Sequence, residues 1–294
     1  MKQLKKEDIP QEVFDLYDDY AHNKIQRREF IEKLSLYTIG GFTLPSLLSF
    51  MMPNYTNTML VDPKDPKLDS EFITYNSGKG GGEIKALLSK PKTFEDKLGG
   101  IVVVHENRGL NPYIEDTARR AALEGFITIA PDALTPLGGY PGTDDEGRAM
   151  QRKRNRNKML EDFIAAFGYL KNHEDCNGKI GVVGFCFGGW IANMMATQVE
   201  DLKAAVPFYG GQPKENIAKI KAPLLLQFAG LDKRVNAGWP AYEESLKAEG
   251  KEYQVFVYPE VNHGFHNNTT ARYNKEAAEL AWKRTIEFFK KKLV

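Results

Sequence analysis

The chain has 294 residues, of which 42% are hydrophobic and 27% are charged. This composition supports a sizeable core and excludes global disorder. Because 40 Lys and Arg residues nearly cancel 39 Asp and Glu residues, the net charge of +1 gives no sign of a nucleic-acid partner or of binding to an anionic membrane. Cys176 and Cys186 are too few for a disulfide framework. No Cys/His cluster in the sequence has the spacing of a zinc site, so we expect no metal.

Residues 1–52 predict a helical N-terminal extension. Arg27 and Arg28 precede an apolar run over 34–52, a pattern similar to a twin-arginine export signal. Three features argue against that signal: the arginine pair follows an acidic opening segment, Pro45 interrupts the apolar run, and no alanine occurs over 51–62 for a cleavage site. We therefore expect a folded extension on a cytoplasmic protein without an integral membrane anchor. Periplasmic export is the alternative.

The main domain is expected over 71–294, after a linker at 53–70 that is rich in Pro, Asp and Asn. It opens with a predicted antiparallel strand pair at 71–76 and 83–89. Buried strands are then expected at 100–104, 125–130, 179–184, 203–208, 223–228 and 253–258, and helices at 114–124, 158–171, 186–198, 239–249 and 273–292. This alternation predicts an α/β fold with a mainly parallel central sheet and helices on both faces.

The strongest chemical signal is the motif GFCFGG at 184–189, which places Cys186 between a buried strand and a helix. A nucleophile on such a tight turn has a strained backbone, and the glycines let neighbouring chains approach. The turn lifts the side chain above the carboxyl edge of the sheet, where α/β sheets bind ligands. The helix N-terminus favours the thiolate, and the Phe187 N–H is a candidate oxyanion donor. Taken alone, the motif fits a buried, inert cysteine equally well.

An acid and a base follow Cys186 in the chain order nucleophile, acid, histidine. Asp232 lies in the loop after the 223–228 strand, and His263 lies in the loop after the 253–258 strand. All three are thus expected at one edge of the sheet, as a catalytic triad. His266 is the competing base, and we favour His263 because it directly follows the strand exit.

Three polar residues follow the 100–104 strand at the same edge of the sheet: His105, Glu106 and Asn107. We expect the Asn107 N–H to complete an oxyanion hole with Phe187, because such holes combine the residue after the nucleophile with an early strand–helix loop. His105 is expected to be a hydrogen-bonded structural residue rather than a catalytic one.

Together these motifs resemble the dienelactone hydrolase (carboxymethylenebutenolidase) family of the α/β-hydrolase superfamily. The resemblance covers roughly residues 71–292 and rests on HENRG at 105–109, APD at 130–132, GFCFGG at 184–189, LD at 231–232 and NHGF at 262–265. It implies the α/β-hydrolase fold and a triad of Cys186, His263 and Asp232. It also implies that Glu106 lies close to the thiol and helps to form the thiolate when substrate arrives.

The sequence departs from this family at the positions that bind the carboxylate of the substrate. Members that act on dienelactone bind its carboxylate with arginines, at positions occupied here by Asn267 and by the arginine-free segment 133–137. Arg108 and Arg272 are candidate replacements, and Tyr140 is a candidate substrate contact in the loop 138–143. The nucleophile is therefore better supported than dienelactone as the substrate.

The sequence predicts a hydrolase that cleaves an ester or lactone bond of a small molecule through a thioester intermediate, without a metal or organic cofactor. Two alternatives stay open: a thiol-based redox or binding protein on a hydrolase scaffold, and a thioesterase or peptidase of the same fold. The apolar N-terminal extension either covers a surface of its own chain or joins two chains in a homo-oligomer.

Overall fold

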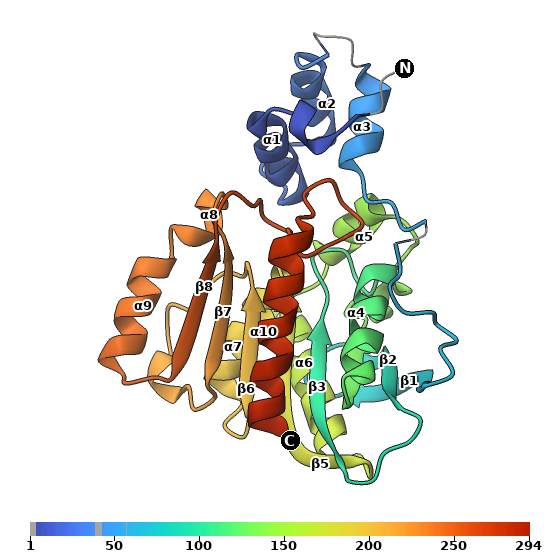
Figure 1. Ribbon diagram of the computed structural model, residues 1–294, viewed down its shortest axis with the longest axis vertical. Coiled ribbons are helices and arrows are strands. Elements are labelled where there is room, and N and C mark those ends of the chain that lie inside the picture. Colours follow the sequence, from blue (N-terminus) through green and yellow to red (C-terminus); the bar gives the residue numbers. More distant parts are fainter. Residues whose placement is uncertain (1–3, 39–42, 57) are drawn as a thin grey trace.

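The computed structural model describes residues 4–38, 43–56 and 58–294, which form a helical cap and a body centred on a sheet (Figure 1). The helical cap, within residues 4–51, contains α1 (Gln11–Ala21), α2 (Arg27–Ser35) and α3 (Leu44–Met51). Their apolar faces form a separate small core, in which the Tyr20 and Phe30 rings stack with centroids 4.6 Å apart. Within the described ranges, no helix is both long and apolar enough to span a membrane.

The described part of the body contains an eight-stranded sheet in the order β1-β2-β4-β3-β5-β6-β7-β8. β2 runs antiparallel to both of its neighbours, and all other neighbouring strands are parallel, so the predicted antiparallel pair β1–β2 and the mainly parallel sheet are both confirmed. The strands are β1 (Leu68–Ser77), β2 (Gly82–Pro91), β3 (Leu98–Val104), β4 (Phe126–Pro131), β5 (Cys176–Phe185), β6 (Ala204–Phe208), β7 (Leu224–Ala229) and β8 (Tyr253–Tyr258).

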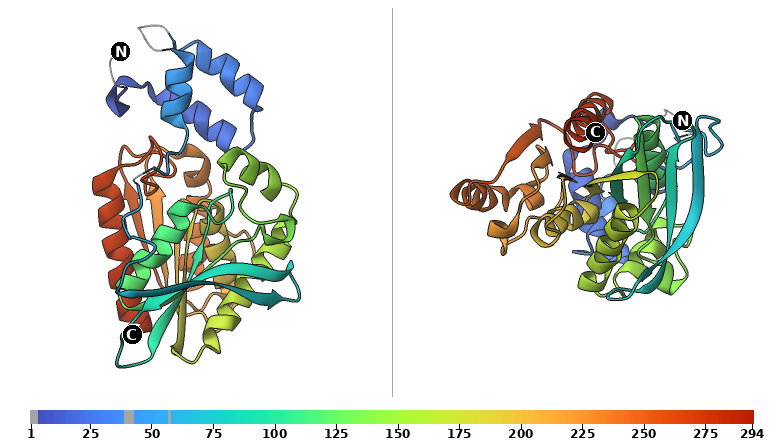
Figure 2. Two further views of the ribbon diagram at one scale, coloured as in Figure 1. Left: turned by 90° about the vertical axis from the view of Figure 1, so that its right-hand side faces the viewer. Right: turned by 90° about the horizontal axis from the view of Figure 1, so that it is seen from below.

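Helices cover both faces of the sheet (Figure 2). On one face lie α4 (Pro112–Leu123) and α10 (Lys275–Leu293), and on the other lie α6 (Arg156–Lys171), α7 (Phe187–Gln198) and α9 (Trp239–Ala248). In β5, Val182 enters one of the two cores and Val183 enters the other. Burial on both faces explains why the central strands are continuously apolar.

The helical cap sits on the carboxyl edge of the parallel strands (Figure 1). Its hydrogen bonds to the body include one from the Tyr20 hydroxyl to Asp145 at 2.7 Å and one from Gln11 to Asn262 at 2.5 Å. Asp145 belongs to α5 (Asp144–Gln151), a short helix at the same edge as α8 (Lys233–Asn236). The cap therefore covers the edge at which an α/β sheet binds its ligands.

Two segments differ from the sequence prediction. β1 begins at Leu68, inside the expected linker, because an edge strand pairs through its backbone and tolerates polar side chains there. Helix α5 was not predicted because the residues on its buried face, Asp144, Gly147, Arg148 and Gln151, are not apolar. That glycine lets the helix pack on the loop after β3, where a Cβ would overlap the carbonyl oxygen of Arg108.

Candidate active site

Cys186 lies on a strained turn between β5 and α7, with φ of 57° and ψ of −108°. Its N–H donates to the carbonyl oxygen of Phe208 at 3.1 Å, which ties the turn to β6. A Cβ at Gly184 would overlap the carbonyl of Gly188, and a Cβ at Gly188 would overlap the carbonyl of Val104. The glycines of the GFCFGG motif are therefore required by close backbone contacts, as the sequence predicts.

Asp232 and His263 meet at the carboxyl edge of the sheet. Asp232 caps α8 through a hydrogen bond from the Val235 N–H at 3.0 Å, and its other carboxylate oxygen lies 2.5 Å from His263 Nδ1. Both side chains are buried. Within the part of the chain that the structure describes, His263 Nε2 has no hydrogen-bond partner, so it is available to the pocket that contains the sulfur.

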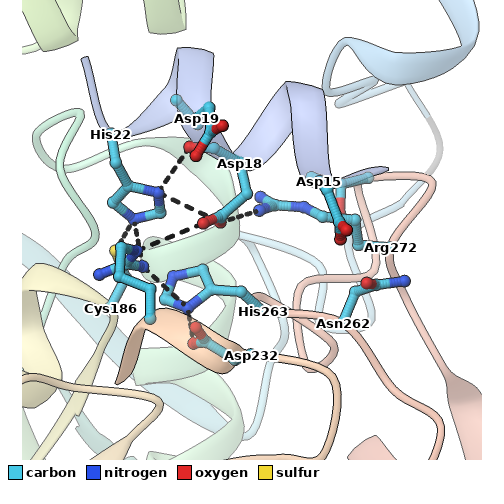
Figure 3. A network of polar contacts seen from close by, with 12 residues as sticks. Asp15, Asp18, Asp19, His22, Cys186, Asp232, Asn262, His263 and Arg272 are labelled. Atoms are coloured by element: carbon cyan, nitrogen blue, oxygen red, sulfur yellow. Dashed lines mark hydrogen bonds and ion pairs between the residues drawn. The ribbon is translucent and has the colours of Figure 1, made fainter. Parts of the chain in front are cut away.

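A second histidine, His22, contacts Cys186 from the helical cap (Figure 3). His22 Nε2 lies 3.2 Å from Cys186 Sγ, and its ring packs edge-on against His263 with centroids 4.7 Å apart. One potential ligand atom from each of His22, Cys186 and His263 lies within 4.8 Å of the other two. We call these three residues the thiol–imidazole cluster. Sequence reasoning missed His22 because no motif surrounds it and only the docked cap brings it to the sulfur.

The charges of the cluster favour the thiolate. Burial acts to raise the pKa of Cys186, but His263 and His22 outweigh it and hold this pKa well below its ordinary value. Burial acts to lower the pKa of His263, but the charges of Asp232, Cys186 and Asp18 raise it to about 10. A thiolate beside imidazolium is therefore the favoured state at neutral pH.

The cluster also has the donors that a soft or borderline metal ion prefers, a thiolate and two imidazoles. Each imidazole has its Nδ1 directed at a carboxylate, which is the usual outer contact of a metal-bound histidine. Sequence spacing gave no sign of this grouping, because its members come from three distant segments.

The two residues predicted to donate to an oxyanion, Phe187 and Asn107, border the same pocket as Cys186. As the first residue of α7, Phe187 has an N–H without an intrahelical acceptor. The Asn107 side chain donates to the carbonyl oxygen of Ala21 at 2.7 Å, which fixes its loop against the cap. The Glu106 carboxylate is buried and accepts a hydrogen bond from Asn267 at 2.8 Å.

The two other histidines of this edge have structural partners. His105 Nδ1 lies 2.5 Å from the carbonyl of Glu106, and His105 Nε2 accepts from the Ala133 N–H at 3.2 Å, in agreement with its predicted structural role. His266 Nδ1 lies 2.6 Å from the Tyr113 hydroxyl, deep in the core. Burial holds the pKa of His266 well below its ordinary value, which keeps this ring neutral.

A pocket of about 800 Å³ opens above Cys186, and basic side chains line it, of which Arg148, Arg154 and Arg234 form ion pairs with Asp145, Asp162 and Asp18. Among the described residues that line it, none is Asp or Glu, and six are basic: Arg148, Arg152, Arg154, Arg156, Lys214 and Arg234. Arg156 lies over the Trp190 ring at 3.5 Å, and its side chain is exposed to solvent. The segment 148–156 thus brings arginines to the pocket from a part of the chain that sequence analysis did not single out.

The residues predicted to contact the substrate lie outside the pocket above Cys186. Arg108 is buried and forms an ion pair with Asp144, and the Tyr140 hydroxyl donates to the same carboxylate at 3.0 Å. Arg272 is also buried, and its guanidinium lies 3.4 Å from Asp18. None of these three side chains lines the pocket above Cys186. Their contacts with Asp144 and Asp18 hold α5 and the cap in place, which explains why they do not face the pocket.

Comparison with known proteins identifies the family of this chain. Residues 84–293 match the model of the dienelactone hydrolase family. The chain belongs to the dienelactone hydrolase family. It has the α/β-hydrolase fold, and it is a hydrolase of a family whose members cleave ester or lactone bonds. Residues 1–39 separately match a family described as YqhI-like, and the described part of this range, 4–38, belongs to the cap.

Curated relatives agree with this assignment. A Saccharolobus solfataricus protein, provisionally named carboxymethylenebutenolidase, is 31% identical over 258 residues, which cover 74% of this chain and 97% of that protein. YghX of Escherichia coli K12, provisionally named a hydrolase fragment, is 50% identical over 111 residues, or 38% of this chain and 95% of the fragment.

Solved structures share the fold at lower identity. A dienelactone hydrolase-like promiscuous phosphotriesterase from metagenomic libraries has a TM-score of 0.67 at 21% identity, covering 78% of this chain and 100% of its own. The dienelactone hydrolase of Anabaena variabilis has a TM-score of 0.60 at 20% identity, with the same two coverages.

Proposed function

We propose that this dienelactone hydrolase family member cleaves an ester or lactone bond by covalent catalysis, with Cys186 as the nucleophile, His263 as general acid and base, and Asp232 as the residue that orients His263. The observation that carries the proposal is that an acid, a base and a cysteine gather at one sheet edge. The Asp232 carboxylate lies 2.5 Å from His263 Nδ1, and the His263 ring shares a cluster within 4.8 Å with the sulfur of a strained turn.

The reaction follows from the positions and charges of these groups. The Cys186 thiolate attacks the carbonyl carbon, and the Phe187 and Asn107 N–H groups bind the oxyanion. His263 imidazolium protonates the leaving oxygen as the tetrahedral intermediate collapses to a thioester. The neutral His263 then takes a proton from water, which attacks the thioester and releases the thiolate. Glu106 is the proposed modulator of the thiol, through its buried carboxylate at the same edge.

The cationic lining favours a substrate that carries a negative charge away from the scissile bond. The arginines expected from the family pattern are replaced here by Asn267 and an arginine-free segment, but Arg152, Arg156 and Lys214 are exposed and line the pocket. A carboxylate or phosphate on the substrate would find both charge and hydrogen-bond donors there.

The test is hydrolysis of aryl esters and lactones of varied acyl size by the full-length chain. Cys186→Ala is expected to abolish turnover, while Cys176→Ala, a matched cysteine substitution in the core, retains it. Hydrolysis that persists in Cys186→Ala would refute the assignment of the nucleophile.

A second candidate function, thiol-based redox sensing, is favoured by one observation, the depressed pKa of Cys186. A sensor needs the thiolate but no general base for water. Loss of ester hydrolysis in His263→Ala, with alkylation of Cys186 retained near pH 10, supports the hydrolase. Absence of ester hydrolysis in the wild type, together with oxidation of Cys186 by peroxide, supports the sensor. A thioesterase or peptidase of this fold would be recognised in the same assay by its preferred leaving group.

A further inference from the structure

The helical cap supplies a second carboxylate–histidine pair to the nucleophile. His22 follows the last residue of α1, and its Nδ1 lies 2.8 Å from the carbonyl oxygen and 3.1 Å from the carboxylate of Asp18. Its Nε2 lies 3.2 Å from Cys186 Sγ. The arrangement repeats that of Asp232 and His263, so two imidazoles, each with a carboxylate behind it, converge on one sulfur (Figure 3).

The body holds the Asp18–His22 pair of the helical cap in place. Asp18 forms ion pairs with Arg234 of α8 at 3.3 Å and with Arg272 at 3.4 Å, and both arginines belong to the body. The His22 side chain is only 15% exposed. Because the interface fixes both members of the pair, His22 is oriented toward the sulfur rather than placed there as a mobile surface side chain.

We propose that His22, positioned by Asp18, is a catalytic residue that takes the proton of the Cys186 thiol in the resting enzyme, so that the helical cap is part of the active site. This inference rests on the proposed function, because it assumes that Cys186 is the nucleophile. The helical cap, which the sequence alone would suggest is an appendage or an export signal, thereby has a chemical role.

The two histidines take part in different proton transfers. The S–H bond of Cys186 breaks and an N–H bond forms at His22 Nε2, which leaves a thiolate beside an imidazolium. His22 keeps this proton through the cycle and stabilises the thiolate each time it is released. The proton that the leaving oxygen takes comes from His263, and water returns one to His263 in the second half of the reaction. No oxidant or other co-reactant is required.

The charged groups that face His22 set its protonation. Asp18 and the Cys186 thiolate favour the imidazolium, whereas Arg234 Nη2, 3.0 Å from His22 Nε2, and the protonated His263 oppose it. Two negative groups thus bracket the ring, Asp18 at Nδ1 and the thiolate at Nε2, and this placement favours the imidazolium. Removal of the Asp18 charge should therefore weaken the effect of His22 without removing its ring.

The test is the pH dependence of Cys186 alkylation by iodoacetamide in the full-length chain, measured by mass spectrometry on the peptide that contains Cys186. At about pH 6 we expect His22→Ala and His22→Gln to react roughly tenfold or more slowly than the wild type, because an opposite charge within about 4–6 Å favours the ionised form by one or more pKa units. Near pH 10 the rates should converge. Asp18→Asn should fall in between, with kcat reduced more than KM is raised.

His173→Ala is the matched control, because this histidine lies before β5 at the opposite edge of the sheet. Circular dichroism of each variant shows whether the fold is retained, and His22→Gln keeps the size and polarity of the side chain if His22→Ala is unstable. An alkylation profile in both folded His22 variants that matches the wild type would overturn the inference and leave Cys186 as the nucleophile. Hydrolysis by Cys186→Ala would instead overturn the proposed function, whatever the alkylation rates.

Discussion

Replacement of Asp232 by Asn tests the orientation and charging of His263. The carboxylate lies 2.5 Å from His263 Nδ1, and Asp232 makes the largest charge contribution to the rise of the His263 pKa from 6.5 to about 10. That rise corresponds to roughly 5 kcal/mol in favour of the imidazolium. An amide at this position removes the negative charge and can present an N–H to Nδ1, which favours the wrong tautomer.

We expect kcat for an aryl ester to fall about a thousandfold or more in Asp232→Asn, in line with the loss typical of a triad acid. The pKa of His263 should fall toward its ordinary value, as measured by NMR titration and by the pH dependence of kcat/KM between about pH 6 and pH 10. Asp19→Asn is the control, because Asp19 is a partly exposed carboxylate that pairs with Lys24. Activity of Asp232→Asn within about threefold of the wild type would refute the role of this carboxylate.

Four further outcomes are expected. Zn²⁺ should inhibit ester hydrolysis reversibly through the thiol–imidazole cluster, with weaker inhibition in His22→Ala; equal inhibition of both proteins would contradict a shared site. Arg156→Ala should raise KM for a carboxylated ester several-fold and leave the neutral analogue unaffected, as steady-state kinetics on the matched pair would show. Gly188→Ala should lower thermal stability and abolish activity, because its Cβ would overlap the backbone of β3. His263, His22 and Arg272 outweigh burial and hold the pKa of Asp18 well below its unfolded value of 3.8. The ionised Asp18 therefore stabilises the folded protein above about pH 4, and this stabilisation is lost on acidification. The free energy of unfolding, measured in urea, should depend less on acid pH in Asp18→Asn than in the wild type.

The order of elements and the strained turn at Cys186 could be predicted from local sequence. Continuously apolar strands indicated a sheet covered on both faces, and the glycines of GFCFGG indicated the close backbone contacts that the turn makes. Asp232 and His263 were placed at one edge because parallel strands end together. These inferences succeeded because each depends on a few consecutive residues or on the general geometry of a parallel sheet.

Residues that depend on packing between distant segments could not be predicted in this way. Arg108 and Tyr140 were expected at the substrate, but both bind Asp144, whose helix has a buried face that is not apolar. The cationic wall of the pocket is formed instead by the segment that contains Arg152 and Arg156.

The N-terminal extension shows the same division. Its amino acids by themselves determined that it would be helical, and they left its place and purpose open. Only the tertiary structure put His22 within 3.2 Å of a cysteine that lies 164 positions along the chain. The physical reason is that the helices of the cap contain the apolar residues for their own core. Their position on the body depends instead on ion pairs such as those of Asp18 with Arg234 and Arg272. These two arginines come close to Asp18 only after the sheet has formed.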